Sequence, residues 1–185
     1  EKPEAVGGKN LIEMLYNSNA IGGNATGNEA MWALIALDSG KYKVPENAKW
    51  TREKLITEVL RYKTSDNGFA LTQGQEAGVD TTAMAIQALA PYYQKDENVK
   101  TAVNNALEYL KSKMNRNCQY ESSEAGAQVL IALTALGLDP VEAKNGFVKS
   151  AARNLISGLD KYRVGESGFK HLLADEKINP MASGQ

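Results

Sequence analysis

Three alanine-rich segments share one pattern, and this repetition constrains the fold more than any other feature. Residues 28–37, 80–89 and 124–133 each begin with an acidic or amide residue, continue with small and aliphatic residues, and end in Ala-Leu. Aligning the final Ala-Leu makes Asn28, Asp80 and Glu124 coincide. A helix that is apolar nearly all round is buried on most sides. The pattern therefore predicts three buried helices that recur after 52 and then 44 residues, a spacing typical of helical repeat proteins.

A second kind of segment alternates with the buried ones. Apolar residues step by three and four over 99–114 and 148–159, and the same stripe begins at 55–60, with charged and amide residues between them. Residues around 11–15 have the same character. This spacing predicts amphipathic helices with one face in water. No alternation is long enough to predict a sheet.

A similar turn follows each of three amphipathic segments. The turns are residues 66–69, 117–120 and 166–169, and each ends in an aromatic residue. We expect the aromatic to return the chain to the core. Buried and wet helices that alternate in this way stack into a solenoid or a ring of two concentric layers. The predicted fold class is therefore all-α, with residues 1–185 forming one domain.

Composition excludes several classes of function. The apolar fraction of 43% suits a packed core, and 21 Lys and Arg against 22 Asp and Glu give a net charge of -1. That balance argues against a nucleic-acid partner. No apolar run approaches the ~18 residues of a membrane helix. The single cysteine, Cys118, excludes an internal disulfide and a zinc site built from cysteines.

The repeats resemble a known family. Val79–Leu89 and Ser123–Leu133, with the exit Leu136–Pro140 and the glycine-aromatic turns, are similar to the prenyltransferase/squalene-oxidase repeat of the terpenoid cyclase and protein prenyltransferase superfamily. The closest type occurs in bacterial surface and secreted proteins of unassigned activity. The resemblance covers roughly residues 8–185. It implies an α/α toroid of paired inner and outer helices, located at the cell surface or secreted.

The resemblance also implies an incomplete ring. Residues 179–185 look like the start of a fourth inner helix, and three and a half pairs do not close a ring of the family's usual size. We therefore expect the chain to be a truncated part of a larger protein, and the remainder beyond Gln185 to be one of its partners.

The resemblance points to one catalytic candidate. Class II cyclases protonate their substrate with the middle Asp of Asp-x-Asp-Asp-Thr-Ala, and residues 78–83 read Gly-Val-Asp-Thr-Thr-Ala. Asp80 takes the place of the acid, with Glu124 assisting, but Gly78 and Thr81 replace the other two aspartates. Because the motif needs neighbouring carboxylates to keep its acid protonated, we favour a structural role for Asp80 as an N-cap or a hydrogen-bond partner of the adjacent hairpin.

Other chemistries of the superfamily lack their residues. A protein prenyltransferase holds zinc with Asp, Cys and His, but Cys118 and His171 fall in different repeats, and His171 is expected at a turn or on the surface. The thioester proteins need Cys-Gly-Glu-Gln, and Cys118 is followed by Gln-Tyr-Glu. We expect no metal and no cofactor.

The sequence favours a non-catalytic ligand-binding or scaffold module of a bacterial extracellular or surface protein. A bound apolar small molecule, or a surface partner, would lie where Asn28, Trp32, Asp80 and Glu124 converge at the starts of the buried helices. Two alternatives stay open: a squalene-cyclase-type enzyme with Asp80 as general acid, and a cobalamin-type carrier, since that type also uses an α/α toroid.

Overall fold

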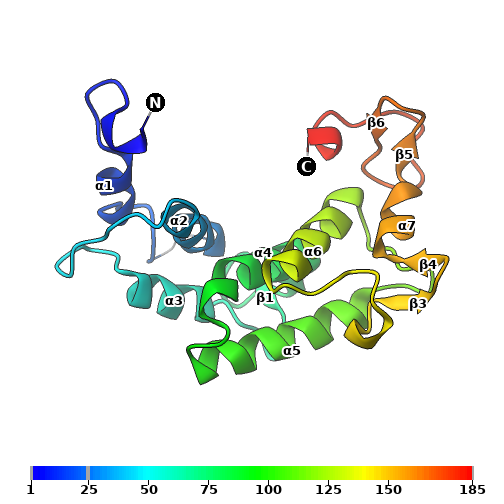
Figure 1. The fold of residues 1–185 in the computed structure, drawn as a ribbon, viewed down its shortest axis with the longest axis horizontal. Coiled ribbons are helices and arrows are strands. Elements are labelled where there is room, and N and C mark those ends of the chain that lie inside the picture. The colour runs from blue at the N-terminus through cyan, green and yellow to red at the C-terminus, as the bar shows by residue number, and fades with distance from the viewer. Residues whose placement is uncertain (1, 24–25, 185) are drawn as a thin grey trace.

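The computed structural model describes residues 2–23 and 26–184. Within these ranges the chain is a mostly helical domain, with seven α-helices and three small two-stranded hairpins, and 48% of it is helical. Figure 1 shows the helices arranged along a curve, with the two chain ends above its opposite arms. The prediction of a mostly helical domain is confirmed, and three small two-stranded hairpins accompany the helices.

The helices follow the predicted segments closely. They are α1 (Leu11–Tyr16), α2 (Gly27–Ser39), α3 (Arg52–Leu60), α4 (Val79–Leu89), α5 (Glu97–Lys113), α6 (Ser123–Ala135) and α7 (Leu155–Asp160). Short 3-10 helices occur at Pro3–Ala5, Ala90–Tyr92, Ala143–Asn145 and Ala182–Gly184.

The three alanine-rich segments form α2, α4 and α6, and α4 packs against both of the others. Every residue of α4 is buried except Asp80, which is exposed, and Gln87, which is half-buried. Gln87 donates from Nε2 to Oε1 of Gln128 on α6, at 2.6 Å. The prediction of a helix buried on most sides is confirmed for α4, whereas α2 and α6 each leave one face open, with Trp32 and Ile131 exposed.

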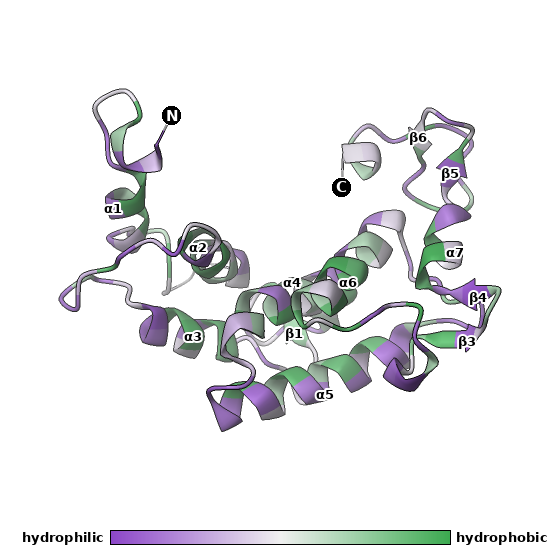
Figure 2. Ribbon diagram, in the orientation of Figure 1, coloured by the Kyte–Doolittle hydropathy of each residue, from purple (hydrophilic) through white to green (hydrophobic). Residues whose placement is uncertain are grey.

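Helices α3 and α5 lie on the convex side of the curve, whereas the short α7 lies in its right arm (Figure 1). Helix α3 packs on α2, α5 on α4, and α7 on α6. Figure 2 shows apolar and polar residues alternating along α5, which lies on the convex side of the bend in the chain. Asp96 begins this helix, because its Oδ1 accepts from the amides of Asn98 and Val99 at 2.8 and 3.2 Å. The predicted amphipathic helix over 99–114 is confirmed.

The prediction of one helix over 148–159 is wrong for its first half. Val148–Ser150 (β3) and Arg153–Asn154 (β4) form an antiparallel hairpin, and α7 begins only at Leu155. Asn154 fixes that start through a capping box: its Oδ1 accepts from the Ser157 amide at 3.0 Å, and its own amide donates to Ser157 Oγ at 3.0 Å. Short apolar runs fit either structure, so spacing alone misassigned this one.

The other two hairpins lie next to predicted turns: the first begins where the turn 66–69 ends, and the second encloses the turn 166–169. β1 (Phe69–Ala70) pairs with β2 (Ala77–Gly78), and β5 (Arg163–Val164) pairs with β6 (Gly168–Phe169). In all three predicted turns an amide donates to the carbonyl three residues before it: Asn67 to Thr64 at 3.1 Å, Cys118 to Asn115 at 3.0 Å, and Ser167 to Val164 at 3.2 Å.

The aromatic residue after each turn differs in burial. Phe69 and Tyr120 lie in the core, as expected, whereas Phe169 is only half-buried. The Arg163 guanidinium lies over the Phe169 ring, 5.8 Å from its centre. The core therefore runs along α2 to α6 and thins toward the C-terminal segment.

Candidate functional site

The three aligned polar residues occupy the same place in their helices. Asn28, Asp80 and Glu124 are each the second residue, of α2, α4 and α6 respectively. The capping positions before them are Thr26, Gly78 and Ser122. Asp80 is therefore not an N-cap, and that prediction is wrong. A carboxylate in the first turn still complements the helix dipole.

Asp80 lies exposed at the start of α4. Its Oδ1 accepts from the amide of Thr81 at 2.7 Å, and it forms no ion pair with any described residue. The hydrogen bond to the hairpin belongs instead to the fully buried Thr82, whose Oγ1 accepts from the Phe69 amide at 2.9 Å and donates to the Gly78 carbonyl at 2.6 Å. Thr82 thus has the structural role expected of Asp80. A catalytic role for Asp80 stays a prediction.

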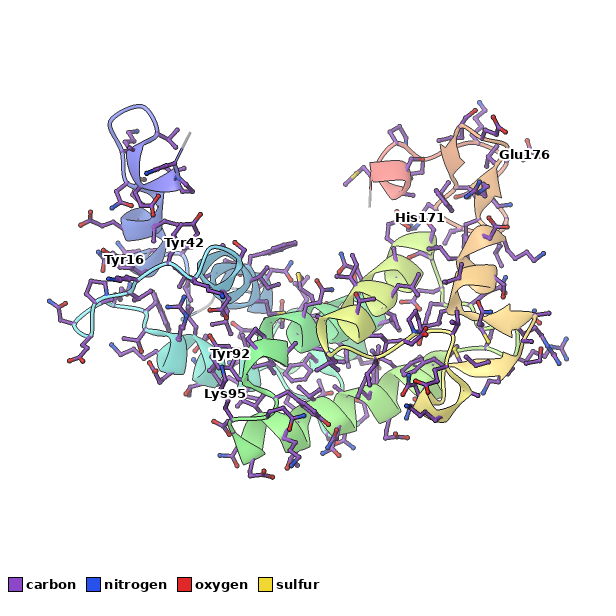
Figure 3. All side chains as sticks on the ribbon, in the orientation of Figure 1. Tyr16, Tyr42, Tyr92, Lys95, His171 and Glu176 are labelled. Carbon is purple, nitrogen blue, oxygen red and sulfur yellow. The ribbon has the colours of Figure 1, made fainter. Side chains whose placement is uncertain are left out.

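Glu124 pairs with His171, which comes from the segment after β6. The imidazole Nδ1 lies 2.9 Å from both carboxylate oxygens, and the Ser123 amide donates to the His171 carbonyl at 3.0 Å. Figure 3 places His171 beside the start of α6. Burial acts to raise the pKa of Glu124, but hydrogen bonds from its own amide, from His171 and from Ser123 outweigh burial and lower this pKa.

Sequence reasoning missed this pair, since 47 residues separate its members. One signal was present: His171 follows Phe169 by two positions, as Leu71 follows Phe69. The Leu71 carbonyl accepts from the first amide of α2 at 2.8 Å, as the His171 carbonyl does from the first amide of α6. Matching the turns would have placed His171 at the start of a buried helix.

We expect Glu124→Gln to cost about 1 kcal/mol or less at neutral pH, because the pair is partly exposed. The folded state lowers the pKa of Glu124, so this stabilisation is present above the ordinary glutamate value of about 4.3 and is lost as the pH falls through the folded-state pKa. Urea unfolding of the parent and the variant at several pH values measures this stabilisation. Glu121→Gln, at an exposed neighbour, is the control. If the parent and Glu124→Gln differ in free energy of unfolding as much at about pH 3 as at neutral pH, the Glu124 carboxylate is not the source of the stabilisation.

A largely apolar groove of about 520 Å³ opens beside the start of α2. Its walls include Leu15, Ile21, Asn28, Trp32 and Ala36. The indole of Trp32 is about half exposed, and the Asn28 Oδ1 atom is buried without a hydrogen-bond partner among the described residues. Two of the four predicted ligand-binding residues thus share one groove.

Asp80 and Glu124 do not line this groove. The four residues are therefore divided between a groove on α2, an exposed carboxylate on α4 and an ion pair on α6. The described residues include no group of three or more His, Cys, Asp or Glu side chains placed to hold a metal ion. In the same part of the chain, no helix is long and apolar enough to cross a bilayer.

Comparisons with known proteins give no further guide to the site. No protein-family model matches the sequence, and no curated protein is significantly similar to it.

Proposed function

We propose that the chain is part of an α/α toroid of the prenyltransferase-like type. Three inner helices packed side by side, each with an outer partner, support this architecture. So do the common helix position of Asn28, Asp80 and Glu124 and the common hydrogen bond of the three turns. Location at the cell surface or outside the cell stays a prediction of the resemblance.

Within this architecture, we propose a non-catalytic module that binds an apolar small molecule in the groove beside Trp32. The observation that carries the proposal is the apolar lining of this groove together with the unpartnered Asn28 Oδ1. Its volume of about 520 Å³ falls within the ~300–1,000 Å³ range of small-molecule sites. A buried acceptor without a donor is costly, so the matching ligand carries one hydroxyl on an apolar body.

Tryptophan fluorescence tests this site directly, because the chain has only Trp32 and Trp50. The Trp50 indole does not line the groove, although it donates from Nε1 to the carbonyl of Ser18, a groove residue, at 3.0 Å. Trp50→Phe therefore leaves Trp32 as the sole reporter. Titration with farnesol, an apolar alcohol, should shift the Trp32 emission to the blue with saturation. Trp32→Ala, with Trp50 present, should weaken binding about tenfold or more, measured by calorimetry, since the lost contact is worth about 1.5–3 kcal/mol.

Ile131→Ala is the matched control, because Ile131 is an exposed apolar residue of α6 outside the groove. It should leave the affinity unchanged. Asn28→Ala should remove the preference for farnesol over the hydrocarbon farnesene. Equal binding by the parent and Trp32→Ala contradicts the site. Conversion of farnesol to a cyclic product, abolished by Asp80→Asn, supports the cyclase alternative instead.

A further inference from the structure

A second groove lies between the turn after α5 and helix α7, and it is polar. Its volume is about 730 Å³, and Asn117, Gln119, Arg153 and Lys161 line it. Helix α7 sits directly on the turn, because an added Cβ at Gly158 would lie 2.0 Å from the Cys118 carbonyl oxygen. The two walls are therefore held at a fixed separation.

Gln119 contributes a side-chain donor to the lining of this groove. Gln119 is only 7% exposed. Its backbone amide donates to Asn115 Oδ1 at 3.0 Å, and its side-chain oxygen Oε1 accepts from Asn115 Nδ2 at 3.2 Å. With the oxygen engaged, Nε2 is the atom left for the groove, and it has no acceptor among the residues that the structure describes. Nε2 is accessible to solvent from the groove, so it is free to donate to an acceptor oxygen of a bound ligand.

The groove also carries unbalanced positive charge. Arg153 and Lys161 form no side-chain ion pair within residues 2–23 and 26–184, although the whole chain has a net charge of -1. The acidic residue of the groove, Asp160, is already paired with Arg163 at 3.0 Å. The Arg153 backbone is anchored, since its carbonyl accepts from Cys118 Sγ at 3.2 Å. Two exposed cations without an ion pair and a side-chain amide thus line one groove.

We propose that this groove binds a small polyoxygenated anion, a sugar acid or a sugar phosphate. The guanidinium fork of Arg153 and the ammonium of Lys161 suit a carboxylate or a phosphate. The Gln119 and Asn117 side chains suit the ring hydroxyls, whose oxygens accept hydrogen bonds. The site is separate from the groove beside Trp32 and does not depend on the function proposed for it.

Calorimetric titration of the chain tests the proposal, with glucuronate, glucose 6-phosphate and neutral glucose as ligands at about 0.15 M salt, where long-range charge effects are screened. Saturable binding of one of the two anions, with none of glucose, is the expected result, and the anion that binds identifies the source. Arg153→Ala and Lys161→Ala should each weaken that binding about tenfold or more.

The matched control is Arg116→Ala, since Arg116 is an exposed cation of the same turn that does not line the groove. It should leave the affinity unchanged. The absence of saturable binding by both anions at millimolar concentration overturns the proposal. An equal loss in Arg116→Ala also overturns it, because binding would then follow net charge rather than the groove. Circular dichroism of each variant confirms that the helices persist.

Discussion

Phe69→Ala is expected to destabilise the domain by about 3–5 kcal/mol, the range for deleting a fully buried aromatic ring. Phe69 is 0% exposed and belongs to the core cluster. Its amide donates to Thr82 Oγ1 at 2.9 Å, so the ring is held where β1 meets α4. Removing the ring leaves a cavity between elements that hydrogen bonds keep in place. Urea unfolding of parent and variant measures the loss.

Phe169→Ala provides the matched comparison, because Phe169 ends the third turn as Phe69 ends the first. Phe169 is half-buried and is covered by the Arg163 guanidinium. Its loss should cost only about 1 kcal/mol, as expected for a partly exposed aromatic with one cation contact. Equal losses in the two variants contradict the unequal burial. A small loss for Phe69→Ala contradicts its place in the core.

The helices that the sequence predicted best are those with a strong local pattern. The alanine-rich segments are apolar on nearly every side, so helices were expected there, but only α4, which packs between α2 and α6, is buried on most sides. Helix α5 carries its own cap at Asp96 and a long regular stripe, and it too matches its prediction. The exposure of Asp80 within α4 could not be read from this pattern, because it depends on which face α2 and α6 leave open.

Long-range contacts account for the parts that the sequence did not predict. The stripe over 148–159 is regular, but Ala151 and Ala152 are exposed and the capping box at Asn154 begins the helix late. The pairing of Glu124 with His171 joins positions from different repeats. The polar groove likewise combines the turn before α6 with residues around α7. Spacing along the chain reports none of these contacts, because each depends on how separate elements pack.

The different roles of Asp80 and Thr82 at the start of α4 also depend on how separate elements pack. The sequence offered Asp80, Thr81 and Thr82 as neighbouring polar residues, and a motif resemblance drew attention to the first. On a helix, successive positions point in different directions, so only one of them meets the hairpin. That residue is Thr82, which is fully buried and hydrogen-bonded to both Phe69 and Gly78.

Gly158→Ala is expected to destabilise the domain by about 3 kcal/mol, at the upper end for overpacking a tight contact. The added Cβ would lie 2.0 Å from the Cys118 carbonyl oxygen and 2.7 Å from its carbon. Both are backbone atoms, so no side chain can rotate away, and α7 must move off the turn. The same shift would widen the polar groove, so the variant should also bind the anion more weakly than the parent.

Gly126→Ala is the control for Gly158→Ala, because it distinguishes the effect of the close contact with Cys118 from the general effect of alanine in a helix. Gly126 lies inside α6, and its added Cβ would meet only Leu159 Cδ1 at an ordinary 3.6 Å. Neither glycine has a positive φ, so alanine suits both backbones. At Gly126 it should stabilise the domain by about 0.5–1 kcal/mol through helix propensity and a less flexible unfolded chain. Urea unfolding measures the change in the free energy of unfolding for each variant. If Gly158→Ala lowers it and Gly126→Ala raises it, the loss at Gly158 comes from the contact with Cys118. If both variants change the free energy of unfolding in the same direction, the close packing of α7 on the turn is contradicted, because the effect would then be a general one of alanine in a helix.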